Sequence, residues 1–368
     1  MWLQLVLVFM ALFVYIELEK GGDTQKKRHQ YVTFLIVVLV LQSALRNLAV
    51  GSDTYSYYLD WEYTKEHRTW SWIWQNFYNV YVLGEGKDAG YHFLMKAIQI
   101  ISPSFRVYLF IVAIAFFVPL YRYIETELKS LKQLYLSFCV YQVLFYSFFS
   151  ITGIRQTLAT IATIYGIKFI KEQKLIPFII TILVASLVHK SVLIFLPFYF
   201  IARIPVGKVS LLVGIAGLPI IFPFARRIAV ILATVSSSDH YMMYAESDWE
   251  TIGAQNFLLF ILASGLIILA AKFKNKAIVS DYICNAMALA IFFTPMMWVD
   301  PTLMRVIQYF SIFVLIGVPL SLDVWSVNRK NVNVIYALFW FALMITIIRH
   351  NYDYGFLWDT MQLGENYR

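Results

Sequence analysis

Residues 1–20 read MWLQLVLVFMALFVYIELEK. The apolar run 2–17 is long enough to cross the hydrocarbon core of a bilayer as a helix, which takes about 17 to 25 residues. The segment lacks a basic start and an A-x-A-like cleavage site, so we expect a retained first span and no cleaved signal peptide. A basic cluster follows it: Lys20, Lys26, Lys27 and Arg28. Because positively charged loops stay in the cytoplasm, the first span is predicted to start outside.

The composition extends this interpretation to the whole chain. Of 368 residues, 60% are hydrophobic and only 14% are charged, with a net charge of +8. The mean hydropathy is +0.66. A soluble surface needs about 25% charged residues, so a bilayer must solvate most of the exterior and membrane lipids are the expected surroundings. The basic residues occur in short clusters between apolar runs, which is the positive-inside pattern and argues against nucleic acid as a partner.

Apolar runs of spanning length recur along the chain. They lie near 2–17, 31–50, 104–122, 133–150, 152–170, 176–202, 256–272, 278–298, 303–322 and 332–349. Two further segments, 90–101 and 209–235, are too short or too broken by glycine and proline, and we interpret them as re-entrant or interfacial helices. If the second crosses twice, the count rises to twelve. The sequence predicts an all-α polytopic integral membrane protein of about 10 (10–12) transmembrane helices, forming a single transmembrane domain over 1–368.

The alternation of sides places the aromatic-rich loops outside. These are the first large external loop 51–90, a second loop 236–255 and the external C-terminal tail 350–368. Trp and Tyr lie beside carboxylates in all three. An interfacial aromatic belt is one explanation. Sugar recognition is the other, because sugar rings pack on aromatic faces while carboxylates bind hydroxyls. We therefore expect any chemistry at the outer face.

An ionisable side chain inside a membrane span costs free energy on insertion, so each such residue is a functional candidate. They are Arg46, Arg155 with Gln156, His189 and Arg305. The three arginines are predicted at one outer level, which suggests a shared anion. Each has a simpler alternative: Arg46 can reach the interface along its stem, and His189 can be a core histidine.

Asp53 and the fifth span leave further alternatives open. Asp53 is either the N-cap of a helix that begins at Thr54 or a functional carboxylate. In the fifth span, small residues follow Arg155 at helical spacing. They serve either helix packing or a slot for a lipid chain.

Five segments occur in the order found in a known family. They are R-N-x-x-x-G-x-D-x-x-x-Y from Arg46 to Tyr57, G-Y-H-F-L-M from Gly90, G-I-R-Q-T-L-A from Gly153, A-S-L-V-H-K-S from Ala185 and M-R-V-I-Q-Y-F around Arg305. This ordered set resembles the bacterial O-antigen and exopolysaccharide polymerases of the EpsG/Wzy type. One departure is GKDAG before Gly90, where the family pattern has an acidic residue followed by proline or glycine.

The resemblance implies a membrane glycosyltransferase of the bacterial cytoplasmic (inner) membrane with its active face external. Such an enzyme transfers a glycan from undecaprenyl diphosphate to a sugar hydroxyl of another lipid-linked repeat unit. It implies an undecaprenyl-diphosphate-linked oligosaccharide as substrate, a flippase and a chain-length regulator as partners, and no cofactor or metal. The corresponding residues here are His189 or Asp53 as the base, and Arg46, Arg155, Gln156, Arg305 and Tyr57 for substrate binding.

Other classes remain open from the sequence. A flippase or other transporter predicts charge throughout the bundle, whereas here it is concentrated at the outer end. An O-antigen ligase-like glycosyltransferase shares the donor chemistry and differs in the acceptor. A membrane acyltransferase requires a histidine beside a carboxylate, for which Asp239 and His240 are the external pair. A non-catalytic assembly protein is the last alternative.

Overall fold

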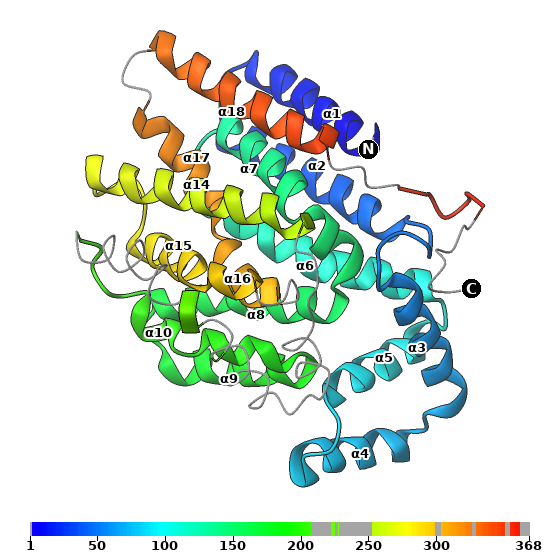
Figure 1. Ribbon diagram of the computed structural model, residues 1–368. Helices are drawn as coiled ribbons and strands as arrows, with labels where there is room; N and C mark the ends of the chain where they lie inside the picture. Colours follow the sequence, from blue (N-terminus) through cyan, green and yellow to red (C-terminus); the bar gives the residue numbers. More distant parts are fainter. Residues whose placement is uncertain are drawn as a thin grey trace. The chain divides into compact units, whose positions relative to one another are not determined.

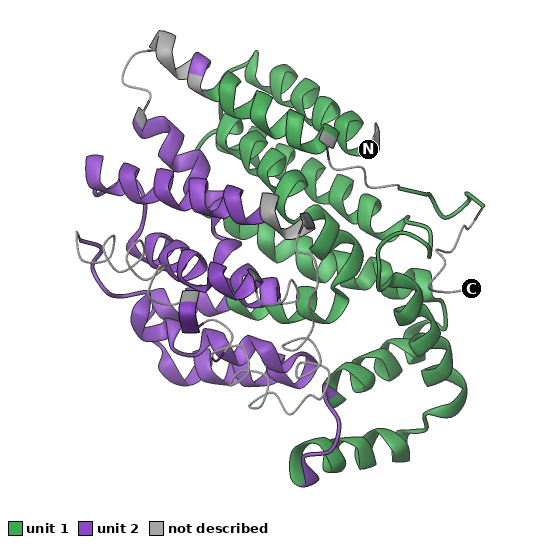
Figure 2. Ribbon diagram, in the orientation of Figure 1, with its two compact units in different colours: residues 1–82, 89–164, 336–368 green, residues 83–88, 165–335 purple. Residues whose placement is uncertain are grey.

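The computed structural model describes residues 2–207, 222–224, 227, 252–298, 303–325, 329–349 and 354–360. Within these ranges the regular elements are helices (Figure 1), so the predicted all-α class is confirmed. The chain divides into two compact units (Figure 2). Loop 236–255 lies outside the described residues except for its last four, which begin a helix, and so does most of 209–235.

Unit 1 comprises residues 1–82, 89–164 and 336–368. Its helices are α1 (Trp2–Glu19), α2 (Gln25–Ala44), α3 (Thr54–His67), α4 (Trp70–Tyr78), the π-helix η1 (Asn79–Leu83), α5 (Ala89–Ile101), α6 (Phe105–Glu127), α7 (Leu131–Leu144) and the π-helix η2 (Tyr146–Thr152). Helix α8 (Ile154–Lys171) leaves unit 1 after Ile164, and α18 (Arg329–Arg349) enters it at Tyr336.

Unit 2 comprises residues 83–88 and 165–335. Its described helices are α9 (Leu175–Val188), the 3₁₀ helix η3 (Lys190–Phe195), α10 (Phe198–Ile201), the 3₁₀ helix η4 (Phe222–Phe224), α14 (Ile252–Lys274), α15 (Asp281–Phe293), the 3₁₀ helix η5 (Thr294–Trp298), α16 (Met304–Ser311) and α17 (Val314–Trp325).

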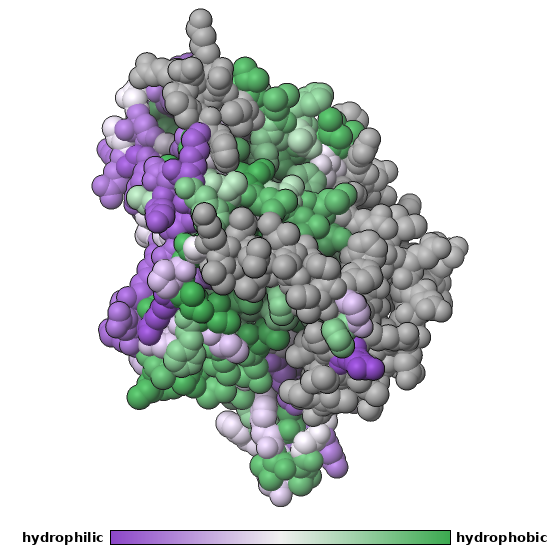
Figure 3. All heavy atoms as spheres, turned by 60° about the vertical axis from the view of Figure 1, so that its left-hand side comes forward, coloured by the Kyte–Doolittle hydropathy of each residue, from purple (hydrophilic) through white to green (hydrophobic). Residues whose placement is uncertain are grey.

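Two described helices, α6 and residues 257–274 of α14, are long and apolar enough to cross a membrane. Two bent pairs add a span each if each pair is one broken span: α7 with η2, bent by 73°, and α16 with α17, bent by 52°. Exposed apolar stripes support a lipid environment. On α1 the exposed residues Val6, Phe9, Met10, Phe13 and Ile16 recur at helical spacing. Figure 3 shows hydrophobic side chains gathered in continuous areas, apart from the hydrophilic ones.

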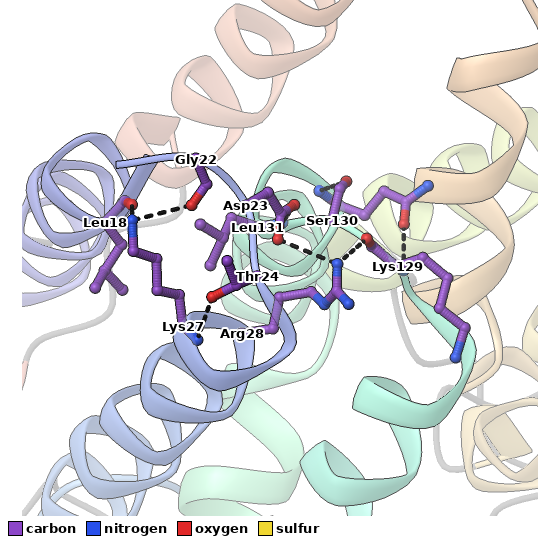
Figure 4. Close-up of polar contacts among 10 residues, drawn as sticks. Leu18, Gly22, Asp23, Thr24, Lys27, Arg28, Lys129, Ser130 and Leu131 are labelled. Atoms are coloured by element: carbon purple, nitrogen blue, oxygen red, sulfur yellow. Dashed lines mark hydrogen bonds and ion pairs between the residues drawn. The ribbon is translucent and has the colours of Figure 1, made fainter. Parts of the chain in front are cut away.

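One end of unit 1 is held by contacts between two loops that the sequence predicts on the same side (Figure 4). The Asp23 carboxylate accepts a hydrogen bond from the Leu131 amide at 2.9 Å and pairs with Arg28 at 3.1 Å. Arg28 also donates to the Lys129 carbonyl at 2.6 Å. The loops after α1 and after α6 therefore share one end of unit 1, as the predicted alternation requires.

The opposite end of unit 1 is closed by residues from the C-terminal region. The Asn47 amide donates to the Gly355 carbonyl at 2.7 Å, and its side chain donates to the Asp359 carbonyl at 2.9 Å. An isolated antiparallel bridge joins Arg46 to Phe356. The described tail residues therefore provide hydrogen-bond partners for the backbone where α2 ends.

In unit 2, α9 and the following segment run antiparallel, with the turn at His189. The ring of Phe178, near the start of α9, has its centroid 5.2 Å from that of Tyr199 in α10 and 6.3 Å from that of Phe195. Phe178 lies eleven residues before His189 and Tyr199 ten residues after it, so their contact defines a helical hairpin. Figure 1 shows α10 returning to the end at which α9 begins.

This hairpin corrects the single span predicted over 176–202. Beyond α10, Arg203 donates to the carbonyl of Ile170 at 3.3 Å, and the Asn285 side chain donates to the carbonyls of Ile201 and Ile204 at 2.8 Å each. Ile170 lies at the end of α8 that carries the basic cluster. The segment therefore begins and ends at the same end of unit 2, because a break at His189 lets both apolar arms pack on each other.

The hairpin makes a topology prediction. Ile204 is 52% exposed. Ile204→Cys, in a background lacking the two native cysteines, is expected to react with an impermeant thiol reagent only after the membrane is opened. Lys276→Cys, in a loop predicted to be internal, is the matched control. If Ile204→Cys is labelled in intact cells and Lys276→Cys is not, residues 176–202 cross the membrane once and the hairpin is wrong.

Candidate functional site

The turn of the α9 hairpin presents the first group of polar side chains. The His189 amide still donates to the Ala185 carbonyl at 3.0 Å, but the backbone of His189 is extended, with φ −156° and ψ 106°. The chain then reverses into η3. The arms on either side are apolar, so His189, Lys190 and Ser191 concentrate the polarity of the hairpin at its apex.

Asp88 is the partner of His189. Its Oδ2 lies 3.4 Å from His189 Nδ1, and its Oδ1 accepts a hydrogen bond from the Lys190 amide at 3.3 Å. Both side chains are buried, with 8% and 5% of their surfaces exposed for His189 and Asp88. A carboxylate at Nδ1 favours the tautomer that carries its proton there, which leaves the basic lone pair on Nε2. The pair has the composition of a histidine base oriented by a carboxylate.

Helix α16 brings an arginine to the same hairpin. The Ser191 hydroxyl lies 2.9 Å from the hydroxyl of Tyr309, which is buried in α16. Arg305 precedes Tyr309 by four residues, so the two share one face of the helix. Arg305 is partly exposed. In unit 2, Arg305 thus lies one helical turn from Tyr309, whose hydroxyl hydrogen-bonds Ser191 at the apex of the hairpin.

Arg155 forms a second group, in unit 1. Its guanidinium carbon lies 6.0 Å from the ring centroid of Tyr57 and 5.8 Å from that of Tyr91. Tyr108 donates to the Tyr91 hydroxyl at 3.0 Å. Burial raises the pKa of Tyr91 above its ordinary value, so its hydroxyl stays protonated. Arg155, from the first turn of α8, is therefore held against aromatic faces that stabilise a cation.

The rest of α8 favours helix packing over a lipid slot. The hydroxyl of Thr160 donates to the Gln156 carbonyl, and that of Thr163 donates to the Thr160 carbonyl, both at 2.8 Å. A side chain added at Gly166 would meet Phe178 of α9 at 3.1 Å. Ala159 is fully buried. The small and hydroxyl residues are thus occupied by close contacts and by the helix backbone.

Arg46 has a different environment from Arg155. It is 2% exposed, its Nε donates to Thr54 Oγ1 at 3.2 Å, and its Nη1 donates to the Ser43 carbonyl. Thr54 in turn donates to the Ile151 carbonyl at 2.9 Å. These neutral contacts join the end of α2 to α3 and η2. The structure favours a structural role for Arg46 and excludes the snorkelling alternative, because the guanidinium is buried.

The turn that follows Arg46 explains its glycine. Gly51 has φ +86°, and an added Cβ would lie 2.2 Å from a side-chain carbon of Ile151, so only glycine fits this turn. Asp53 flanks α3 at the N-cap position, but its side chain makes no capping bond and accepts a hydrogen bond from the Ser52 hydroxyl at 3.2 Å. The predicted helix start at Thr54 and the N-cap position of Asp53 are confirmed, but the Asp53 side chain does not cap the helix.

No group of three or more histidine, cysteine or acidic side chains that could hold a metal ion occurs in the part of the chain that the structure describes.

A model of one protein family, the EpsG family, matches residues 29–361 of the chain. The chain belongs to the EpsG family. The resemblance noted in the sequence is thereby confirmed, and membership indicates a glycosyltransferase-like polymerase in polysaccharide biosynthesis. No curated protein and no solved structure matches this EpsG-family chain.

Asp88 is the functional candidate of this EpsG-family chain that sequence reasoning missed. The one signal was the departure at GKDAG, where Asp88 stands two residues before Gly90. Its φ of +53° is a conformation that aspartate tolerates better than most residues. The roles of His189, Asp53, Arg46, Arg155, Gln156, Arg305 and Tyr57 remain predictions.

Proposed function

We propose that this EpsG-family protein is a polysaccharide polymerase that uses lipid-linked donors at the outer face of the cytoplasmic membrane. The donor is a glycan on undecaprenyl diphosphate, and the acceptor is a sugar hydroxyl of another lipid-linked repeat unit. In the reaction the bond between the anomeric carbon and the diphosphate oxygen breaks, and a bond from that carbon to the acceptor oxygen forms. The diphosphate leaves with the electron pair, and the acceptor loses one proton.

The observation that carries the proposal is the buried pair of His189 and Asp88. The acceptor hydroxyl needs a base, and Nε2 of His189 is the proposed proton acceptor. Asp88 orients the ring through Nδ1 and stabilises the imidazolium that forms. Asp53, whose carboxylate makes no capping bond, is the competing candidate base.

The arginines supply the second requirement of this chemistry. A diphosphate leaving group develops negative charge as its bond to the sugar breaks, and preorganised cations lower the free energy of that state. Arg305 and Arg155 are the proposed contacts, because a guanidinium stays charged and its planar fork fits phosphate oxygens. Tyr57 and Gln156 flank Arg155 and complete the proposed contacts in unit 1.

Deletion of the gene tests the proposed function against its alternatives. We expect surface glycan to lose its ladder on a gel while a single repeat unit remains attached to its carrier. Loss of all repeats would instead identify a flippase. Full-length polymer that is not attached to its carrier core would identify a ligase.

A further inference from the structure

The segment formed by α4 and η1 is free of charge over its whole length. No charged residue lies between Arg68 and Glu85, whereas α3, the helix before it, carries Asp60, Glu62, Lys65 and Glu66. Exposed helices in water are normally rich in charged residues. The contrast indicates that α3 and α4 face different surroundings.

An aromatic stripe follows one side of this segment. It consists of Trp70, Trp74, Phe77, Tyr78 and Tyr81, which recur at the three- and four-residue spacing of a helix face. Trp74 is 59% exposed and Tyr78 is 50% exposed, whereas Ile73 and Val80 are buried. The side turned away from the stripe carries Gln75 and Asn79, whose side chains hydrogen-bond each other at 2.9 Å. The segment is thus amphipathic without using charge.

The neighbouring elements connect the stripe to a helix that is long and apolar enough to span a membrane. Phe93 of α5 contacts the rings of Trp70 and Trp74, with centroids 5.7 and 5.8 Å apart, so α4 packs on α5 (Figure 1). Helix α5 ends at Ile101, only four residues before α6, which is long and apolar enough to span. Ile100 and Ile101 are 73% and 75% exposed, as expected where a chain meets lipid.

We propose that the aromatic stripe of α4 and η1 binds the phospholipid surface, with its rings at the headgroup level of the outer leaflet. Trp and Tyr favour this level because their rings are apolar and their N–H and O–H groups reach polar headgroups. A helix with an apolar face and a polar face lies in the plane of the interface. The polar side with Gln75 faces water. This inference does not depend on the proposed reaction.

The test uses the full chain in a background lacking the two native cysteines. A single cysteine replaces Trp74 or Gln75 and carries an environment-sensitive fluorophore. Each labelled protein is reconstituted in vesicles of phosphatidylglycerol and phosphatidylcholine. The Trp74→Cys probe should emit at shorter wavelength, and phospholipid brominated on its acyl chains should quench it at least about twofold more than the Gln75→Cys probe. Aqueous iodide should show the opposite preference. Tyr78→Cys on the same stripe should behave like Trp74→Cys, which guards against a local folding defect in one variant.

Equal iodide quenching of the Trp74, Tyr78 and Gln75 probes, with no effect of brominated lipid, would overturn the proposal. The stripe would then be a surface for a glycan or a soluble protein. The vesicles contain no glycan and no soluble protein, so quenching by brominated lipid can only come from contact between the probe and lipid. Polymer formation is not part of the readout, so this outcome is distinct from failure of the proposed function.

Discussion

Replacing His189 with glutamine is expected to reduce polymer formation by about 100-fold or more, which is the lower range for loss of a general base. Glutamine keeps a hydrogen-bonding side chain of similar length but cannot accept the acceptor's proton at neutral pH. The measurement is the rate at which purified protein elongates lipid-linked repeat units, with the amount of folded protein determined in parallel. His29→Gln is the matched control, because His29 is exposed and pairs with Glu125 at the end of unit 1 that is predicted to be internal.

Asp88→Asn separates a positioning role from a structural one. If Asp88 orients His189, kcat should fall while KM for the lipid-linked substrate is unchanged, because only the transition state is affected. A wild-type rate for His189→Gln together with loss of activity in Asp53→Asn would transfer the base role to Asp53. His189 would then be a core histidine.

Replacing Arg155 with lysine should lower polymer yield by about tenfold or more without lowering the amount of protein. Lysine keeps the charge but loses the planar fork and stacks less well on the rings of Tyr57 and Tyr91. Arg155→Ala should lower the yield further. The assay is the surface glycan ladder in cells that carry only the variant. Arg122→Lys, at the end of unit 1 that is predicted to be internal, is the matched control. Near-normal ladders in both Arg155 variants would remove this residue from the reaction.

The hairpin shows what hydropathy alone can and cannot resolve. The apolar run 176–202 has 27 residues, counted inclusively from its bounds. As one helix it would measure about 40 Å at 1.5 Å per residue, well beyond a hydrocarbon core of about 30 Å. That excess length and the polar His189 in its middle were signals of a break. Two antiparallel arms have the same composition as one tilted span, so hydropathy could not choose between them.

Contacts between residues far apart in the sequence could not be predicted either. His189 could be predicted as a candidate because an ionisable group inside an apolar run is expensive. Its contact with Asp88 joins residues 101 positions apart, and no local pattern encodes such a pairing. The surroundings of Arg46 were not predicted either. Its position beside a span end suggested an anion contact. In the structure its guanidinium donates to Thr54 and to the Ser43 carbonyl, and a contact with an anion stays a prediction.

The bridge between Arg46 and Phe356 has a consequence for the order of assembly. Ribosomes make the chain from its N-terminus, so α2 is made about 300 residues before the tail residues that complete the hydrogen bonding at its C-terminal end. Until Gly355 and Asp359 arrive, the amide and side chain of Asn47 lack these acceptors and must rely on water or other groups. The C-terminal end of α2 therefore reaches its final hydrogen bonding only when synthesis is nearly complete, which makes it one of the last parts of unit 1 to mature.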